Sequence, residues 1–148
     1  EVPIQVVNAE PLGMHSNVME AMFTAITRAK KNVYIETPYF IPTECLLQAI
    51  QTASMSGIDV RLVMPKRSDN DFVQYASNSY VEKLLRNKVR VYQYVNGFTH
   101  SKLMIVDDEL VVVGSANMDI RTSFRDQSVH LRQESCSDRQ RHLSHRYE

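Results

Sequence analysis

The segments His100–Asp107 (HSKLMIVD) and Gly114–Asn117 (GSAN) decide how this sequence is interpreted. The first is typical of a β-strand, in which side chains alternate between two faces, so we expect His100 and Lys102 to point the same way. A second apolar strand follows, and the acidic residues 107–109 predict the turn that folds it back onto the first. The sequence therefore predicts a β-hairpin that carries a small set of polar side chains.

These polar side chains match the needs of a phosphate-handling site. We expect the hairpin to bring Ser115 and Asn117 close to the imidazole and the ammonium of the first strand. The imidazole would act as nucleophile or proton donor, the ammonium would neutralise charge, and the hydroxyl and amide would donate hydrogen bonds. Asp107 belongs to the same motif and is counted among the catalytic candidates with His100 and Lys102. It lies five residues beyond Lys102 on the opposite face, which favours a structural role in fixing the hairpin. The alternative is an ordinary hairpin with incidental polar residues.

The composition is that of an ordinary globular domain. The 148 residues suffice for one domain with a real core, and 43% of them are hydrophobic and 23% charged. Seventeen basic residues balance seventeen acidic ones, so we expect no nucleic-acid partner.

Cys45 and Cys136 show no metal-ligand spacing, and we expect reduced thiols and no metal. No apolar run approaches the ~20 residues of a membrane span. Because the chain opens at Glu1 with a strand-like segment, we expect a piece of a longer protein.

Strand-like and helix-like segments alternate along the first hundred residues. The prolines at 38 and 42 predict that regular structure stops between them. The patterns predict strands at 4–7, 33–37, 58–64, 89–95 and 100–106, and helices at 17–31, 43–57 and 68–84. This alternation predicts a layered α-β-α domain of the α/β class with a mixed central sheet.

The segment Arg125–Glu148 differs in kind from the rest. It holds five arginines and three histidines, and its large apolar residues are sparse. We expect it to be irregular or disordered, and a basic tail for anionic lipid or nucleic acid is one functional interpretation. A different hypothesis is that this segment is read one nucleotide out of frame, because permissible codons in another frame encode a strand-like EINQFIYDKSLA from position 125.

The spacing H-x-K-x4-D with G-S-x-N behind it resembles the signature of the phospholipase D superfamily, with six matching positions across eighteen residues. Within that superfamily the chain resembles the C-terminal catalytic half of the bacterial cardiolipin synthases over residues 1–124. The supporting stretches are 33–42 (VYIETPYFIP), 57–61 (GIDVR), 97–102 (GFTHSK) and 114–121 (GSANMDIR). The resemblance implies a phospholipase D-like catalytic domain at 1–124, followed by an aberrant tail at 125–148.

The resemblance also implies an activity. Cardiolipin synthases join two phosphatidylglycerol molecules into cardiolipin and release glycerol, through a phosphohistidine and without a cofactor. They carry two such motifs, which meet at one site, so this chain would need either an N-terminal half with the other motif or a second copy of itself. His100 would be one of two catalytic histidines, either the nucleophile or the general acid. Lys102 and Asn117 would hold the phosphate oxygens, with Ser115 as a helper, at the cytoplasmic face of the cell membrane.

The family places an acidic residue after the motif to orient the histidine. That position falls in the aberrant tail, where Asp126 and Glu134 lack a matching context. Two other functions therefore stay open. One is a homodimeric, single-motif phosphodiesterase or nuclease, and the other is an inactive truncated product.

Overall fold

A computed structural model of the chain describes residues 3–8, 17–115, 117–119 and 128–133. In chain order its elements are β1 (Ile4–Asn8), α1 (Asn17–Thr27), β2 (Asn32–Glu36), β3 (Phe40–Ile41), α2 (Glu44–Met55), β4 (Asp59–Pro65), α3 (Asp71–Arg86), β5 (Arg90–Tyr94), β6 (Leu103–Val106), β7 (Leu110–Gly114), β8 (Met118–Asp119) and β9 (Ser128–Gln133).

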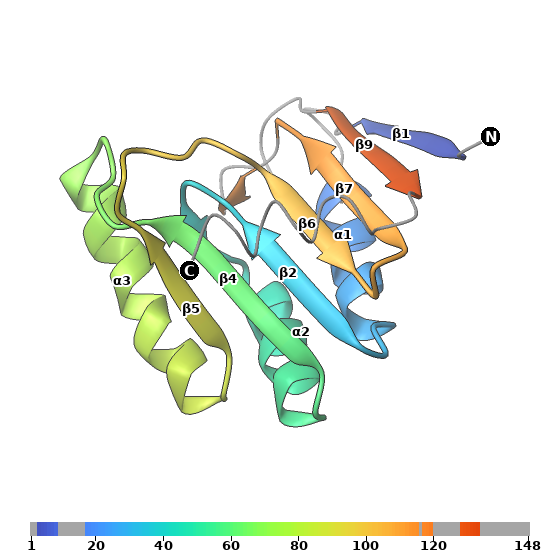
Figure 1. The fold of residues 1–148 in the computed structure, drawn as a ribbon, viewed down its shortest axis with the longest axis horizontal. Coiled ribbons are helices and arrows are strands. Elements are labelled where there is room, and N and C mark those ends of the chain that lie inside the picture. Colours follow the sequence, from blue (N-terminus) through green and yellow to red (C-terminus); the bar gives the residue numbers. More distant parts are fainter. Residues whose placement is uncertain (1–2, 9–16, 116, 120–127, 134–148) are drawn as a thin grey trace.

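The centre of the fold is a mixed seven-stranded sheet in the order β1-β9-β7-β6-β2-β4-β5 (Figure 1). Strands β2, β4 and β5 run parallel, and the chain returns between them through α2 and α3. Strand β6 pairs antiparallel with both β2 and β7, and β9 pairs antiparallel with β7 and β1. The sheet confirms the predicted α/β class and its mixed character.

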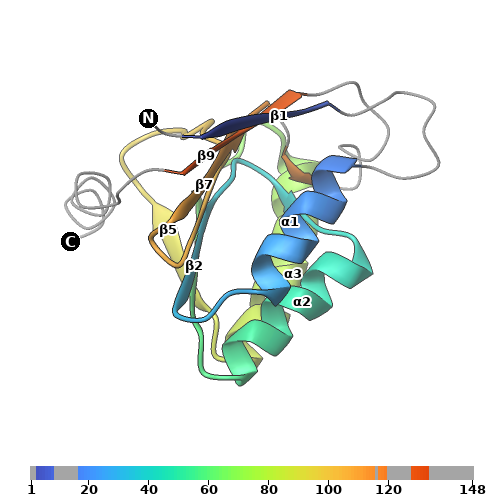
Figure 2. The same cartoon turned by 90° about the vertical axis from the view of Figure 1, so that its right-hand side faces the viewer.

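The three described helices all pack on the same face of this sheet (Figure 2). The expected layering of helices on both faces is therefore seen on one face only, among the residues that the structure describes. Strands β2 and β4 are buried along most of their length, as strands in the middle of a sheet usually are. Their buried side chains meet the apolar faces of α1 and α2 in one core, which includes Met22, Ile26, Val33, Ile35, Leu47, Ile50, Leu62 and Met64.

Most predicted boundaries agree with the structure, and the exceptions have local causes. Helix α2 begins where expected, with the Thr43 hydroxyl accepting a hydrogen bond from the backbone of Leu46. Helix α3 begins after Asn70 rather than at Ser68, because the Asn70 side chain caps the backbone N–H groups of residues 72 and 73. Helix α1 ends at Thr27, before the predicted limit.

Three strands lie where the sequence predicted none, the two-residue strands β3 and β8 and the six-residue strand β9. Strand β3 forms between the two prolines and pairs in parallel with β8, which comes from the segment that follows GSAN. Strand β8 lies far from β3 in sequence, so no local pattern predicts this pairing. Strand β9 forms within the segment expected to be irregular, and its sequence SVHLRQ does alternate apolar with polar residues. The rest of that segment lies outside the described residues, as do Asp126 and Glu134.

Candidate active site

The predicted site residues converge on one edge of the sheet. Residues 100–102 lead into β6, whereas Ser115 and Asn117 follow β7, and the two strands are antiparallel neighbours. The carboxyl ends of β2, β4 and β5 open at this same edge, because β6 enters the sheet antiparallel to β2. In open α/β sheets the crevice outside the carboxyl ends of the strands is the usual place for a ligand.

His100 and Lys102 do not lie inside a strand, contrary to the prediction. Strand β6 begins only at Leu103, which pairs with Glu36, the last residue of β2. Beyond Glu36 the chain turns away at Pro38, so residues 100–102 have no ladder partner on that side. The two side chains nevertheless meet. The Lys102 Nζ lies 3.0 Å from Nδ1 and 3.3 Å from Nε2 of the His100 ring.

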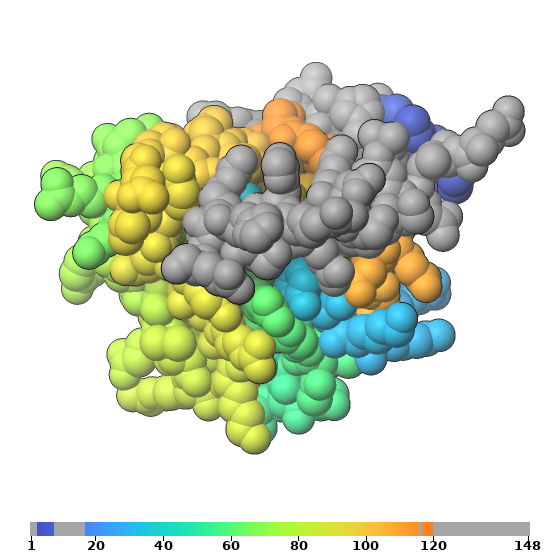
Figure 3. All heavy atoms as spheres, in the orientation of Figure 1, coloured from blue at the N-terminus to red at the C-terminus, as the bar shows by residue number. Residues whose placement is uncertain are grey.

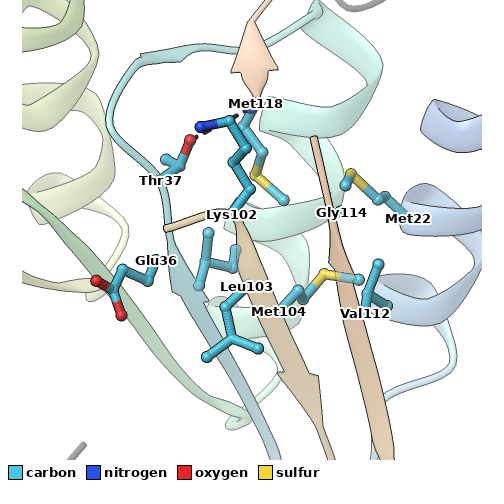
Figure 4. Close-up of a pocket in the computed structure, with 10 residues that line it drawn as sticks. Met22, Glu36, Thr37, Lys102, Leu103, Met104, Val112, Gly114 and Met118 are labelled. Atoms are coloured by element: carbon cyan, nitrogen blue, oxygen red, sulfur yellow. Dashed lines mark hydrogen bonds between the residues drawn. The ribbon is translucent and has the colours of Figure 1, made fainter. Parts of the chain in front are cut away.

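The Lys102 side chain is held by one hydrogen bond and lies beside residues of two other segments. Its Nζ donates a hydrogen bond of 2.8 Å to the carbonyl oxygen of His100. Figure 4 shows its side chain beside Thr37 and Met118, whereas the carboxylate of Glu36 points away from it. Burial lowers the pKa of Lys102 from its usual value, against the opposing attraction of Asp119. A partly desolvated ammonium of this kind interacts more strongly with an arriving anion than an exposed one does.

The ring of exposed His100 packs against two aromatic side chains, which also contact each other at 6.3 Å between centroids. Its centroid lies 6.2 Å from that of Tyr39, edge to face, and 5.8 Å from that of Phe98. The Tyr39 hydroxyl donates a hydrogen bond of 2.6 Å to Asp69, in the connection between β4 and α3. That bond lowers the pKa of Asp69 below its usual value. Sequence reasoning did not assign Asp69 or Phe98 to the site.

A buried carboxylate fixes the residue just before the histidine. Glu36 is only 4% exposed, and its Oε1 accepts a hydrogen bond of 2.5 Å from the hydroxyl of Thr99, which is itself buried. Because Thr99 precedes His100 directly, this contact holds the backbone that carries the imidazole. Sequence reasoning missed the pair, although one acidic residue at the end of the apolar strand NVYIE was a visible signal.

The GSAN segment is held at the same edge by its own contacts. The N–H of Gly114 donates to the carbonyl oxygen of Lys102 at 3.4 Å. The half-buried Asn117 donates from Nδ2 to the buried carboxylate of Asp119 at 3.4 Å. The N–H of Met118 donates to the Thr37 hydroxyl, and β8 pairs with β3 next to Tyr39. The structure thus brings Ser115 and Asn117 to the edge that carries Lys102.

Asp107 is the one motif residue that the structure does not bring to this edge. It lies beyond the other end of β6, roughly 20 Å from His100 at about 3.3 Å per extended residue. Its carboxylate accepts hydrogen bonds from the backbone N–H groups of Lys30, Lys31 and Asn32, at 2.6 to 3.2 Å. Its place among the catalytic candidates is therefore corrected, because it joins the β6–β7 turn to the start of β2.

The electrostatics of Asp107 agree with that position. Partial burial raises its pKa, but the N–H groups of Lys31, Lys30 and Asn32 outweigh this and hold the pKa below its usual value. The turn itself uses two consecutive residues with positive φ, 56° at Asp107 and 62° at Asp108. Such pairs are typical of tight hairpin turns, as the acidic residues 107–109 predicted.

The described residues contain no group of three or more His, Cys, Asp or Glu side chains arranged to hold a metal ion. None of their helices has both the length and the apolar character that crossing a bilayer requires.

Solved structures share this fold. The phospholipase D family member Nuc from Salmonella typhimurium matches with a TM-score of 0.76 and 20% identity, over 98% of this chain and 91% of its own. NucT from Helicobacter pylori matches with a TM-score of 0.75 and 17% identity, over 99% of this chain and 96% of its own. At these identities the similarity establishes the fold alone.

Two curated relatives that are more similar in sequence are both named cardiolipin synthase. The protein from Geobacillus thermodenitrificans is 44% identical over 119 residues, which are 80% of this chain and 24% of that protein. The protein from Halalkalibacterium halodurans is 50% identical over 100 residues, which are 68% of this chain and 20% of that protein. The chain thus spans about a quarter or less of the length of these curated relatives.

The family model described as "Cardiolipin synthase, PLD-like domain" matches residues 22–136. The match includes every residue of the candidate site and extends through β9. Because it covers most of the 148 residues, the chain belongs to the PLD-like domain family of the cardiolipin synthases.

Proposed function

We propose that this domain supplies one half of the active site of a phosphatidyltransferase that makes cardiolipin from two phosphatidylglycerol molecules. The observation that carries the proposal is the contact of 3.0 Å between Lys102 Nζ and the ring of His100, at an exposed sheet edge in a domain of this family. The contact joins a nucleophile or proton donor to the cation that a phosphodiester requires.

The reaction has two displacements at phosphorus. In the first, an imidazole nitrogen attacks the phosphorus of one phosphatidylglycerol and a P–N bond forms. The P–O bond to glycerol breaks, and a second histidine protonates the departing oxygen. In the second, the terminal hydroxyl of another phosphatidylglycerol attacks that phosphorus and loses its proton to the second histidine, and the P–N bond breaks. His100 takes one of these two roles, and both roles are compatible with its exposed ring.

Three side chains at the edge stabilise the phosphate and take no part in the proton transfer. Lys102 offsets the negative charge of the non-bridging oxygens as it builds up in each transition state. Asn117 supplies an amide donor, and Ser115 supplies a hydroxyl from the start of the same loop. Asp119 and the carbonyl of His100 keep the amide and the ammonium in place between turnovers.

The second histidine must come from outside this motif. The proposal assigns it to an N-terminal half with another H-x-K motif, or to a second copy of the chain. The lipid substrate is the basis for proposing that the complete enzyme works at the cell membrane, on its cytoplasmic face. Protease accessibility of a tag next to this domain, in inverted and right-side-out vesicles, tests that orientation.

The activity is tested with the complete enzyme and phosphatidylglycerol vesicles. Cardiolipin and glycerol should appear in equal amounts, and an alkaline quench should trap phosphate on histidine. The Lys30→Gln variant serves as a control that should keep this activity, because Lys30 is exposed at the opposite edge of the sheet. Phosphatidic acid as the only product, or the absence of a covalent intermediate, would contradict the proposed transferase.

A homodimeric, single-motif phosphodiesterase is the second candidate. The observation in its favour is that Nuc and NucT match this chain over nearly their whole length. Two copies related by a two-fold axis would each give one histidine to a shared site. Light scattering combined with a nuclease assay on the isolated chain decides the matter, since a monomer without DNA cleavage excludes it.

A further inference from the structure

A groove lies beside the His100 site. It has a volume of about 600 Å³ and lies between the β4–α3 connection and the β5–β6 connection. The side chains that matter for its chemistry are Lys66, Arg67 and Asp69 from the first connection and Val95 and Phe98 from the second. The two connections lie side by side at the upper left of Figures 1 and 3, in green and yellow.

This groove shares its wall with the candidate active site. Phe98 lines the groove and also packs on the ring of His100, at 5.8 Å between centroids. Asp69 lines the groove and accepts a hydrogen bond from the hydroxyl of Tyr39, whose ring packs on those of both His100 and Phe98. A molecule in the groove is therefore separated from the imidazole by a single layer of aromatic side chains.

The charge of the groove suits an anion. Lys66 and Arg67 are exposed, and within the described part of the chain neither forms a salt bridge. The carboxylate of Asp69 accepts hydrogen bonds from the hydroxyls of Tyr39 and Ser68 and keeps its negative charge. The two cations that line the groove outnumber this one carboxylate, so the groove carries a net positive charge.

The rim of the groove is apolar. Val95 is 65% exposed and Phe98 is 42% exposed, and both come from the β5–β6 connection. An anionic group with an apolar continuation, such as the phosphodiester of a lipid, matches both the cations and this rim. A free inorganic phosphate would use the cations alone.

We propose that this groove binds the phosphodiester of the acceptor phosphatidylglycerol while the active site carries the donor phosphatidyl group. The inference rests on the proposed function and adds the residues that choose the acceptor. The attacking hydroxyl is separated from its own phosphorus by three carbons and one oxygen, so a phosphate in the neighbouring groove leaves the hydroxyl within reach of the active site. The groove is needed because two phosphodiester anions repel each other, whereas water or glycerol meets no such barrier.

The test compares two acceptors in one reaction of the complete enzyme. Phosphatidylglycerol vesicles are incubated with labelled glycerol, which yields cardiolipin when the lipid is the acceptor and labelled phosphatidylglycerol when glycerol is. For the variant Lys66→Gln/Arg67→Gln we expect the ratio of cardiolipin to labelled phosphatidylglycerol to fall at least tenfold, a difference of about 1.4 kcal/mol. The charge reversal Lys66→Glu/Arg67→Glu should lower the ratio further.

The matched control removes the same charge at the opposite edge of the sheet. Lys30 and Lys88 are exposed residues just before β2 and β5, and Lys30→Gln/Lys88→Gln should leave the ratio unchanged. An unchanged ratio of cardiolipin to labelled phosphatidylglycerol in the groove variants would overturn the inference. An equal loss of both products would also overturn it, because these cations would then serve the donor or contact the partner half. If the ratio fell only when free phosphate was added, the groove would bind inorganic phosphate instead. If the parent enzyme forms neither product, the proposed function itself fails.

Discussion

Replacing Asp107 tests whether this residue stabilises the fold or takes part in catalysis. Its carboxylate receives three backbone N–H groups at the junction of the β6–β7 turn with the start of β2. The comparable loss of a side-chain cap at a helix start costs about 0.5–2 kcal/mol. Alanine also tolerates the φ of 56° poorly, at a further cost of about 1–2 kcal/mol. We therefore expect Asp107→Ala to lower the free energy of unfolding by about 2–3 kcal/mol.

Two other variants divide this cost into its parts. Asparagine accepts a positive φ and keeps one acceptor oxygen, so Asp107→Asn should lose only about 1 kcal/mol. Asp107→Gly removes the acceptors but relieves the backbone, so it should fall between the other two. For a domain of this size, 1 kcal/mol corresponds to about 2–4 °C in Tm. Thermal and urea denaturation of the 148-residue chain measure these differences.

The pH dependence gives an independent check. The folded-state pKa of Asp107 is lowered, so the stability it contributes is present above the ordinary carboxyl pKa and is lost as pH falls through the lowered value. The difference between the parent chain and Asp107→Asn should therefore be full at neutral pH and vanish in strong acid. The reasoning is refuted if Asp107→Asn leaves stability unchanged at neutral pH, or if it abolishes turnover of the complete enzyme at a temperature where the protein stays folded.

Four further predictions concern other parts of the chain. Lys102→Met should lower kcat/KM at least a hundredfold, as loss of a charge-stabilising donor usually does, without loss of stability, because the ammonium it removes is partly desolvated. In the parent enzyme the lowered pKa of Lys102 should make activity fall at a less alkaline pH than for an ordinary lysine, as a pH–rate profile would show. Thr99→Val, which removes the donor, should lower kcat about tenfold with little change in KM. Thr99→Ser keeps the hydroxyl and Glu36→Gln keeps an acceptor oxygen, so both should lose less, whereas equal effects of serine and valine would argue against positioning of the histidine. Genomic DNA should show a family-like frame across position 125 if the tail is a frameshift product, and the same Arg-rich tail in related strains would reject that hypothesis.

The sequence predicted what depends on local pattern. The hairpin of β6 and β7, the strands β2, β4 and β5 and the helices between them all follow from apolar periodicity and turn residues. The cap at Thr43 and the acidic turn at 107–109 follow from the chemistry of single residues. Strand β9 carried an alternating pattern as well, but the many charges around it concealed the pattern.

What the sequence could not supply are the contacts between distant segments. The hydrogen bond from Thr99 to Glu36 joins residues 63 positions apart, and the bond from Tyr39 to Asp69 joins residues 30 positions apart. Strand pairing brings each pair together, and no local pattern encodes which side chains then meet. His100 and Lys102 do meet, as the sequence predicted, but they do so before the start of β6 rather than inside a strand.

The most direct test of the account is the rate of cardiolipin formation by the complete enzyme with His100→Ala. A histidine that attacks phosphorus or transfers the proton cannot be replaced by a methyl group, so the rate should fall about a thousandfold or more while the unfolding transition stays unchanged. A variant that retains cardiolipin synthesis within tenfold of the parent would contradict the assignment of this sheet edge as the active site.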